Sequence, residues 1–197
     1  MKPQAFIFIG RSGCGKGTQA GLLMKKLKEI DAAREILYIQ TGGEFRKFIQ
    51  GQSFTEKLSH DYYMTDKLQP EFLAVHMWVR PLVEEYKGNQ HLVLDGTPRK
   101  PGEGVILDSV FGFYGFEKPI VIVIEISEEE SLKRLAQRKR LDDAPDDVKK
   151  RLQWYQTDVV PTIEHFRNDA RYQVMDINGE RSVEEIHADI VKRVGLL

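Results

Sequence analysis

The sequence predicts an α/β protein with a five-stranded parallel sheet that carries helices on both faces. Five short apolar runs alternate with segments whose apolar residues recur at helical spacing. The most continuous run, Ile120 to Ile126, is typical of a central strand that is buried on both faces. A glycine-rich turn at residues 10–18 joins the first run to a helical pattern, and strand–helix alternation of this kind builds parallel sheets.

Each pattern predicts one element. The expected strands span residues 5–9, 36–39, 91–94, 120–126 and 172–177. The expected helices span residues 19–28, a polar stretch from 41 to about 66, then 70–86, 105–113, a segment after 127, 142–168 and a segment after 182. Thr41, Ser127 and Ser182 are expected N-caps, because their hydroxyls can accept from the first amides of a helix. Pro81 and Pro161 are expected to kink or end their helices, since proline lacks the amide donor.

Length and composition limit the classes of function. The 197 residues suffice for one domain with a full core, and 29 basic against 30 acidic residues leave a net charge of −1. This balance argues against binding to nucleic acid or to a membrane surface, which a strongly basic face would favour. The single cysteine, Cys14, excludes an intrachain disulfide, and we find no transmembrane or signal segment. We therefore expect a cytoplasmic monomer.

The turn from Gly10 to Thr18 predicts a phosphate-binding loop (P-loop). Its glycines let several backbone N–H groups point inward, and the helix that follows adds about half a unit of positive charge at its N-terminus. Lys16 can reach the β- and γ-phosphates of a nucleotide. The usual pattern has serine or threonine directly after the lysine, whereas here Gly17 precedes Thr18. The alternative, a glycine-rich turn without a ligand, is disfavoured by the strand before it and the helix after it.

Ligands of parallel sheets bind where the strands end, so residues that follow different strands should converge there. Lys16, Thr18, Asp95 and Arg99 all follow strand ends. Asp95 can hold the water shell of Mg²⁺, and Arg99 can bind a phosphate with both arms of its guanidinium group. An Asp-Gly pair is also a common turn, so Asp95 by itself leaves both interpretations open.

A group of arginines extends this site. Arg134 and Arg138 lie four residues apart on one predicted helix face, and Arg140 and Arg151 follow. Such a charge run is usually a solvated face. Phosphoryl transfer, however, requires the charge of two phosphate groups to be neutralised, so beside a phosphate-binding loop we interpret these arginines as phosphate ligands.

These motifs resemble the adenylate kinase family of nucleoside monophosphate kinases over nearly the whole chain. Residues 10–19 are similar to the donor loop of the family, in which the extra glycine is also present. The run Asp95-Gly96-Thr97-Pro98-Arg99 is similar to its Asp-Gly-aromatic-Pro-Arg element. Residues 41–46 and 63–66 look like parts of its acceptor-binding arm, and residues 134–143 with 150–152 look like its lid and flanks.

The resemblance implies reversible, Mg²⁺-dependent phosphoryl transfer from ATP to a nucleoside monophosphate, with AMP as the favoured acceptor. It implies one domain over residues 1–197, with an acceptor-binding arm at about 41–70 and a very short lid at about 138–143. It assigns ATP binding to Gly13, Cys14, Gly15, Lys16, Gly17, Thr18, Arg134 and Arg138. It assigns acceptor binding to Thr41, Arg46, Met64, Gly96, Arg99, Glu103, Arg140 and Arg151. It assigns catalysis to Lys16, Arg99, Arg138, Arg140 and Arg151, and Mg²⁺, largely through water, to Thr18 and Asp95.

Three positions depart from the family pattern. Gly43 replaces an aspartate that helps to order water around Mg²⁺, which should weaken metal positioning unless Glu44 substitutes. Thr97 replaces an aromatic residue, which should change packing more than chemistry. Glu103 replaces the glutamine that reads the acceptor base. An ionised carboxylate only accepts hydrogen bonds, so it suits guanine better than adenine.

Two other functions therefore stay open. The first is a kinase for another acceptor such as GMP, which Glu103 favours and Thr41, typical of the AMP-using branch, opposes. The second is a catalytically weak nucleotide-binding module, in which Gly43 marks a decayed metal site. A protein that binds one nucleotide would not need both sets of arginines, so the enzyme is the favoured interpretation. A GTPase switch is disfavoured because the chain has no base-reading Asn-Lys-x-Asp stretch.

Overall fold

A parallel five-stranded sheet forms the centre of the protein. The computed structural model describes residues 2–65, 69–138 and 145–196, except for the side chains of residues 138 and 145–148. The strands lie in the order β2-β3-β1-β4-β5, and all four neighbouring pairs are parallel. Their bounds are β1 Ala5–Gly10, β2 Ile36–Gln40, β3 His91–Asp95, β4 Ile120–Glu125 and β5 Gln173–Asn178. The predicted fold class and the five predicted strands are confirmed.

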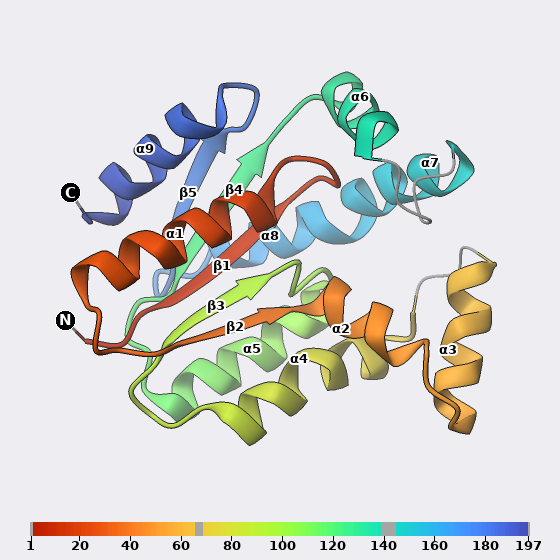
Figure 1. Cartoon of the computed structure of the whole chain (residues 1–197), viewed down its shortest axis with the longest axis horizontal. Helices are drawn as coiled ribbons and strands as arrows, with labels where there is room; N and C mark the ends of the chain where they lie inside the picture. Colours follow the sequence, from red (N-terminus) through yellow and green to blue (C-terminus); the bar gives the residue numbers. More distant parts are fainter. Residues whose placement is uncertain (1, 66–68, 139–144, 197) are drawn as a thin grey trace.

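Helices cover both faces of this sheet (Figure 1). One face packs against α1 (Lys16–Ile30) and α9 (Val183–Val194). The other packs against α4 (Glu71–Glu85), α5 (Pro101–Tyr114) and α8 (Val160–Arg167). No helix within the described residues is long and apolar enough to cross a lipid bilayer.

Alternating side chains of the central strands divide the core into two clusters. Phe6 and Phe8 of β1 pack on the α1 side, and Ile7 and Ile9 of the same strand pack on the α4 side. Trp78 of α4 is fully buried in the second cluster. Because successive side chains of a strand point to opposite faces, a strand covered on both faces must be apolar at every position. The continuous apolar runs of the sequence have this origin.

The remaining helices lie beyond the carboxyl ends of the strands. α2 (Thr41–Phe48) follows β2 directly, and α3 (Phe54–Met64) stands apart from the sheet at one end of the molecule (Figure 1). α6 (Glu128–Arg138) follows β4, and α7 (Pro145–Trp154) leads back toward the sheet. Helices therefore flank any ligand site at the strand ends on both sides.

One predicted cap is wrong. Thr41 is the first residue of α2 rather than its N-cap, which is Gln40 and makes no side-chain capping bond. Pro81 lies inside α4, which continues to Glu85 and matches the predicted span, and a kink at Pro81 stays a prediction. Ser127 and Ser182 do cap their helices, since each hydroxyl accepts from the amide three residues later.

The helix expected over residues 142–168 is not continuous. Residues 142–144 lie outside the described part, and α7 gives way to a π-helical turn, η1 (Tyr155–Val159), before α8 begins at Val160. The irregular turn precedes Pro161, where the prediction placed a kink. Proline removes one amide donor and its ring collides with the carbonyl four residues earlier, so the backbone widens just before it.

Candidate active site

The loop between β1 and α1 has the backbone of an anion cradle. Gly13 and Gly15 adopt left-handed conformations with φ of +83° and +94°, which a side chain would strain. Gly15 is the N-cap of α1, so the free amides of that helix begin at the loop. The Lys16 ammonium donates to the carbonyls of Gly10 and Arg11 at 2.8 and 2.9 Å. A cation thus lies against the loop on a stem long enough to turn outward.

Helix α6 packs directly onto this loop. The Ser131 hydroxyl donates to the Ser12 carbonyl at 2.7 Å, and a Cβ added to Gly13 would lie 3.3 Å from the Ser131 carbonyl oxygen. One turn later, Arg134 donates to Glu130 at 2.7 Å and to the Gly179 carbonyl at 2.9 Å. The guanidinium of Arg134 is thereby held beside the loop, between α6 and the turn that joins β5 to α9.

Glycine occupies the position between Lys16 and Thr18 because a side chain there would be crowded. A Cβ on Gly17 would lie 3.3 Å from Oδ2 of Asp95, so the carboxylate at the end of β3 approaches the first turn of α1. Asp95 is 5% exposed and accepts from the Tyr38 hydroxyl and from Nε2 of Gln40, both at 2.9 Å. Burial, and then the charge of Asp95, raise the pKa of Tyr38, which keeps its phenol protonated as a donor.

The oxygen-bearing side chains beside α1 suit a hard cation that is bound by protein oxygens together with phosphate oxygens. Asp95 lies next to the first helical turn, and the exposed Thr18 is on that turn. Within the described residues no group of three His, Cys, Asp or Glu side chains could bind a metal by themselves. Mg²⁺ commonly keeps several waters and binds one or two protein oxygens together with substrate phosphates, and these residues fit that pattern.

A second cationic group lies at the end of β2. A Cβ on Gly42 would be 3.3 Å from Nη1 of Arg46 and 4.0 Å from Nη2 of Arg99, so both guanidinium groups flank this glycine. Arg99 also donates to the Gly96 carbonyl at 2.9 Å. The neighbouring Thr41 is 3% exposed, and its hydroxyl has no hydrogen-bond partner in the described part of the chain. Two guanidinium groups thus lie beside Gly42, and the residue before it carries an unsatisfied buried hydroxyl.

Glu103 is buried, not solvated. It is 2% exposed, and its carboxylate accepts from the Thr97 hydroxyl at 3.1 Å and from the Arg99 amide at 3.3 Å. Burial raises the pKa of Glu103 above its ordinary value. The two departures at positions 97 and 103 therefore form one polar pair, and the expectation that Thr97 changes packing more than chemistry stays a prediction.

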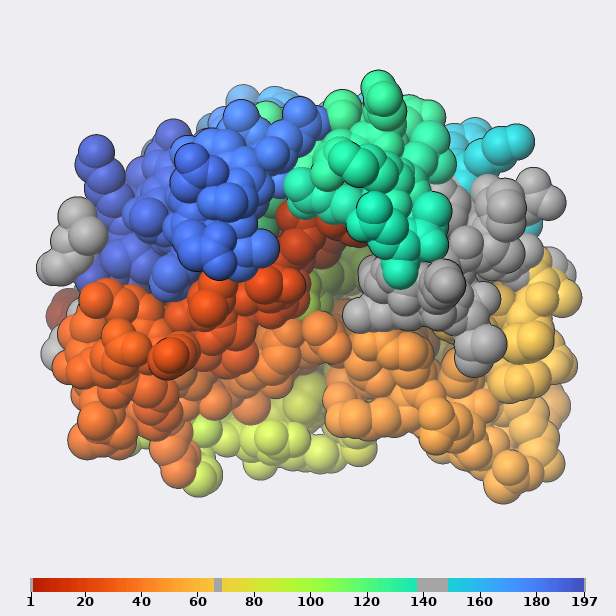
Figure 2. All heavy atoms as spheres, turned by 45° about the horizontal axis from the view of Figure 1, so that its top comes forward, coloured from red at the N-terminus to blue at the C-terminus, as the bar shows by residue number. Residues whose placement is uncertain are grey.

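Other predicted residues lie around this centre. Arg151 is half-buried on α7, and Met64, the last residue of α3, is 65% exposed. Cys14 is buried, with Sγ 3.6 Å from the Lys16 ammonium. Arg140, the side chain of Arg138 and most of the expected lid at 138–143 lie outside the described residues. The space-filling view shows a hollow between the P-loop (red), α2 (orange) and α6 (teal) (Figure 2).

Sequence reasoning missed several residues that hold this site. Tyr38 and Gln40 bond Asp95, Ser131 bonds the loop, and Arg11 lies over the Tyr155 ring with its guanidinium carbon 4.5 Å from the ring centroid. The strand-end rule applies to Gln40, because it is the last residue of β2. Nothing in the sequence points to the other three.

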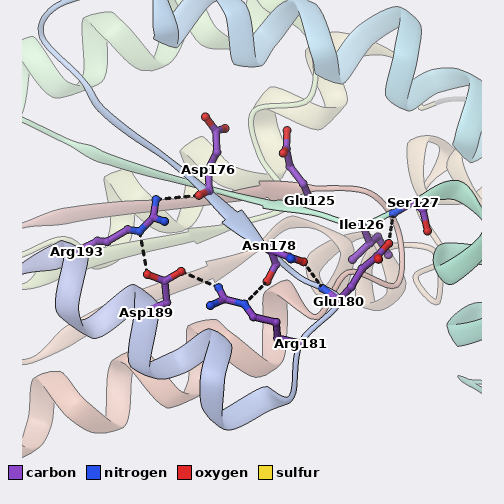
Figure 3. A pocket seen from close by; sticks show the side chains of 9 residues that line it. All are labelled: Glu125, Ile126, Ser127, Asp176, Asn178, Glu180, Arg181, Asp189 and Arg193. Carbon is purple, nitrogen blue, oxygen red and sulfur yellow. Dashed lines mark hydrogen bonds and ion pairs between the residues drawn. The ribbon is translucent and has the colours of Figure 1, made fainter.

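Two further polar clusters lie away from the site. A cavity of about 590 Å³ opens at the outer edge of β5, where Arg193 and Arg181 donate to the Asp176 and Asn178 carbonyls and share Asp189 (Figure 3). Its arginines thus occupy carbonyls along the unpaired edge of β5.

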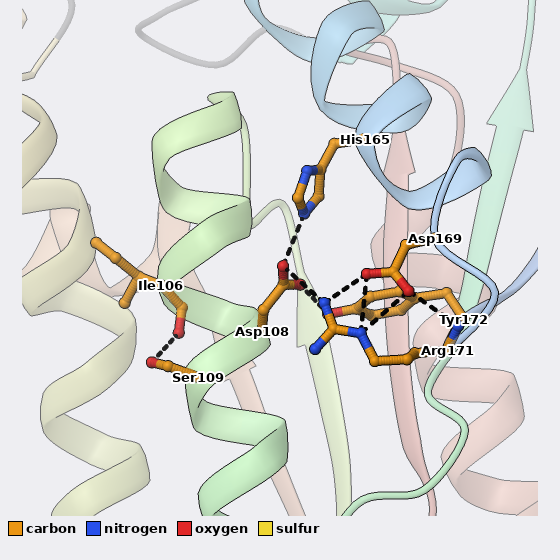
Figure 4. Close-up of polar contacts among 7 residues, drawn as sticks. All are labelled: Ile106, Asp108, Ser109, His165, Asp169, Arg171 and Tyr172. Atoms are coloured by element: carbon orange, nitrogen blue, oxygen red, sulfur yellow. Dashed lines mark hydrogen bonds and ion pairs between the residues drawn. The ribbon is translucent and has the colours of Figure 1, made fainter.

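The second cluster ties the helices of one face together. Asp108 of α5 accepts from the Tyr172 hydroxyl, contacts His165 of α8 at 3.0 Å and pairs with Arg171 at 3.1 Å (Figure 4). Its partners come from α8 and from the segment that leads into β5. We assign this cluster to the scaffold.

Comparison with known proteins agrees with this geometry. The family model described as adenylate kinase matches residues 8–171. The adenylate kinase of Corynebacterium diphtheriae is 31% identical over 189 residues, which cover 96% of this chain and 98% of that protein. Adenylate kinase 1 of Nostoc sp. is 28% identical, and the match covers 96% of this chain and 97% of that protein. The adenylate kinase of Phocaeicola vulgatus is 29% identical, and the match covers 95% of this chain and 96% of that protein. The chain, with its phosphate-binding loop and separate pair of guanidinium groups at one sheet edge, belongs to the adenylate kinase family of nucleoside monophosphate kinases.

Proposed function

We propose that the chain transfers the terminal phosphoryl group of ATP reversibly to AMP, with Mg²⁺ as cofactor. One observation carries this proposal: the P-loop and the pair Arg46 and Arg99 are two cationic groups at the same sheet edge. A protein that bound one nucleotide would need only the P-loop and not the pair Arg46 and Arg99. Two phosphate-binding groups on opposite sides of Asp95 suit two nucleotides whose phosphates face each other.

On the donor side, the P-loop amides and Lys16 would bind the ATP phosphates, and Arg134 would stack on the base. The amides are fixed in place before the nucleotide arrives, because the positive-φ glycines and Ser131 hold the loop. Such preorganised donors stabilise developing charge without reorganising during the reaction. When bound, Mg²⁺ neutralises phosphate oxygens, and Thr18 and Asp95 would hold it largely through water.

On the acceptor side, Arg46 and Arg99 would bind the AMP phosphate, and Thr41, Gly96 and the backbone near Met64 would line the site. The buried hydroxyl of Thr41 without a partner supports this assignment, because an unsatisfied buried polar group is costly unless a ligand completes it.

The transfer itself needs alignment and charge rather than a general base. An oxygen of the acceptor phosphate attacks the γ-phosphorus, the bond to the bridging oxygen breaks, and ADP is the leaving group. The acceptor phosphate is already ionised, so no proton must be removed first. Lys16 and Arg99, with Arg138, Arg140 and Arg151, would spread over the transferring group, and holding both reactants in line supplies much of the rate enhancement.

A GMP kinase is the second candidate, because Glu103 carries a carboxylate where the family reads the acceptor base. The bonds of Glu103 to the Thr97 hydroxyl and to the Arg99 amide engage both carboxylate oxygens within the protein, which weakens the argument that this carboxylate accepts from guanine. These contacts favour AMP.

The test is a coupled phosphotransfer assay with AMP, GMP, CMP and UMP, each with and without Mg²⁺. We expect the highest kcat/KM with AMP and turnover that depends on Mg²⁺. Faster turnover of GMP would establish the second candidate. Binding of ATP without turnover of any acceptor would show a nucleotide-binding module instead.

We further propose that the enzyme acts as a cytoplasmic monomer. The single cysteine, which is buried in the P-loop, excludes an intrachain disulfide and supports a reducing compartment. Sedimentation at micromolar concentration should give one species with a mass near 22.7 kDa, and a larger mass would overturn it.

A further inference from the structure

Gln40, the last residue of β2, contacts both halves of the site. Its Nε2 donates to Oδ2 of Asp95 at 2.9 Å and to the Tyr38 hydroxyl at 3.0 Å. Its Oε1 accepts from Nη2 of Arg46 at 3.5 Å. One neutral side chain therefore joins the carboxylate on the donor side to a guanidinium group on the acceptor side.

The same side chain fills the space beside Gly43. A Cβ added to Gly43 would lie 3.0 Å from Oε1 of Gln40, which is tighter than nine in ten real Cβ contacts, so the Gln40 side chain would have to move by a few tenths of an ångström. The nearby carboxylate of Glu44 does not occupy this space, because it pairs with Lys47 at 2.8 Å and with Arg80 at 3.8 Å. The glycine at position 43 and the glutamine at position 40 are thus sterically linked.

We propose that Gln40 is a positioning residue that replaces a side chain at position 43. It orients the Asp95 carboxylate toward the metal's water shell and fixes Arg46 for the acceptor phosphate. This inference rests on the proposed function, since it names the groups that Gln40 serves in that reaction.

The chemistry of the amide explains why glutamine suits this position. Its N–H₂ end donates to an anion and its carbonyl end accepts from a cation, so the two opposite charges fix which way the group faces. A glutamate of equal length would satisfy Arg46 but would place a second negative charge against Asp95. Alanine would leave a buried carboxylate with one donor fewer and would leave Arg46 without this acceptor.

The first test separates positioning from general stability in the Gln40→Ala variant. We expect the Mg²⁺ concentration for half-maximal turnover to rise about tenfold, the order expected when a hydrogen bond to a charged group is lost. Metal-free calorimetry should show AMP affinity lowered by about the same factor, with ATP affinity unchanged. Gln40→Glu should keep AMP affinity near that of the unmodified protein but raise the Mg²⁺ requirement. Unchanged Mg²⁺ requirement and AMP affinity in Gln40→Ala would overturn the inference.

The second test uses the steric link. In the unmodified background Gly43→Asp should lower the melting temperature and raise the Mg²⁺ requirement, because the new side chain meets Oε1 of Gln40. Combined with Gln40→Ala, the same substitution should restore a low Mg²⁺ requirement, since an oxygen ligand then occupies vacated space. Gly112→Asp is the matched control, because a Cβ there meets nothing within 4 Å.

The two proposals fail in different ways. Absence of both AMP turnover and AMP binding in the unmodified protein would refute the proposed function. The link between positions 40 and 43 would then be judged from thermal unfolding alone. Additive effects of Gln40→Ala and Gly43→Asp on the melting temperature would overturn it, and a smaller loss in the double variant than their sum would support it.

Discussion

Ser131→Ala should loosen the P-loop through a single lost contact. The Ser131 hydroxyl is fully buried and donates to the Ser12 carbonyl at 2.7 Å. Losing such a bond and leaving the half-buried Ser12 carbonyl without its donor costs about 1–3 kcal/mol. For a domain of this size each kcal/mol shifts the melting temperature by about 2–4 °C, so a fall of about 2–12 °C follows.

The assay pairs thermal unfolding with calorimetric ATP binding, and the chain offers a matched control. Ser109→Ala removes a hydroxyl that also donates to a carbonyl, that of Ile106, at 2.7 Å, but on an exposed helix surface. We expect little change in the melting temperature of this variant and unchanged ATP affinity. Ser131→Ala should lower both values, because the loop amides lose their support from α6. Equal effects of the two substitutions, or unaltered ATP affinity in Ser131→Ala, would refute this reasoning.

Three further predictions test individual charges. Lys16→Ala should lower kcat by about 10²–10³, since it removes the cation that would bind the transferring phosphate; kinetics like those of the exposed-site control Lys25→Ala would contradict its role. Arg99→Ala should raise the KM for AMP more than that for ATP, and an unchanged AMP affinity by calorimetry would contradict the acceptor assignment. Because burial raises the pKa of Glu103 in the folded state, its stabilising effect is present below the ordinary value of 4.5 and is lost as pH rises through the raised value. Urea unfolding from pH 4 to 8 should therefore show the unmodified protein losing stability relative to Glu103→Gln, and parallel pH profiles would exclude this linkage.

The fold was predictable because its three inner strands, β3, β1 and β4, are buried on both faces. Runs such as residues 120–124 have no polar position, so neither their state nor their central place in the sheet depended on distant partners. Local chemistry also fixed the caps at Ser127 and Ser182. The π-helical turn before Pro161 was not predictable, because a proline tells where a helix is strained but not which backbone adjustment relieves the strain.

The site was predictable only along the backbone. Asp95 and Arg99 could be placed because strand ends share one edge of the sheet. What contacts them could not, since Tyr38 and Gln40 reach Asp95 from a neighbouring strand whose order in the sheet the sequence does not state. The burial of Glu103 could not be predicted for the same reason, because it depends on contacts with the Thr97 hydroxyl and the Arg99 amide.

The site combines rigid groups at the strand ends with charged groups on the elements beyond the sheet. The groups at the strand ends, such as Gly10, Gln40 and Asp95, are held by the parallel ladders and by the buried side chains beneath them. The other charges lie on elements beyond the sheet: Arg46 on α2, Arg134 on α6, and Arg99 in the loop after β3. A small rotation of such an element moves its guanidinium group relative to the sheet edge. Coulomb attraction between such groups and a phosphate falls with distance and is weakened by water, so their effect depends on how closely these elements approach the fixed edge. We therefore expect the side chains that tie the outer elements to that edge, Ser131 on the donor side and Gln40 on the acceptor side, to influence the reaction through the position of these elements.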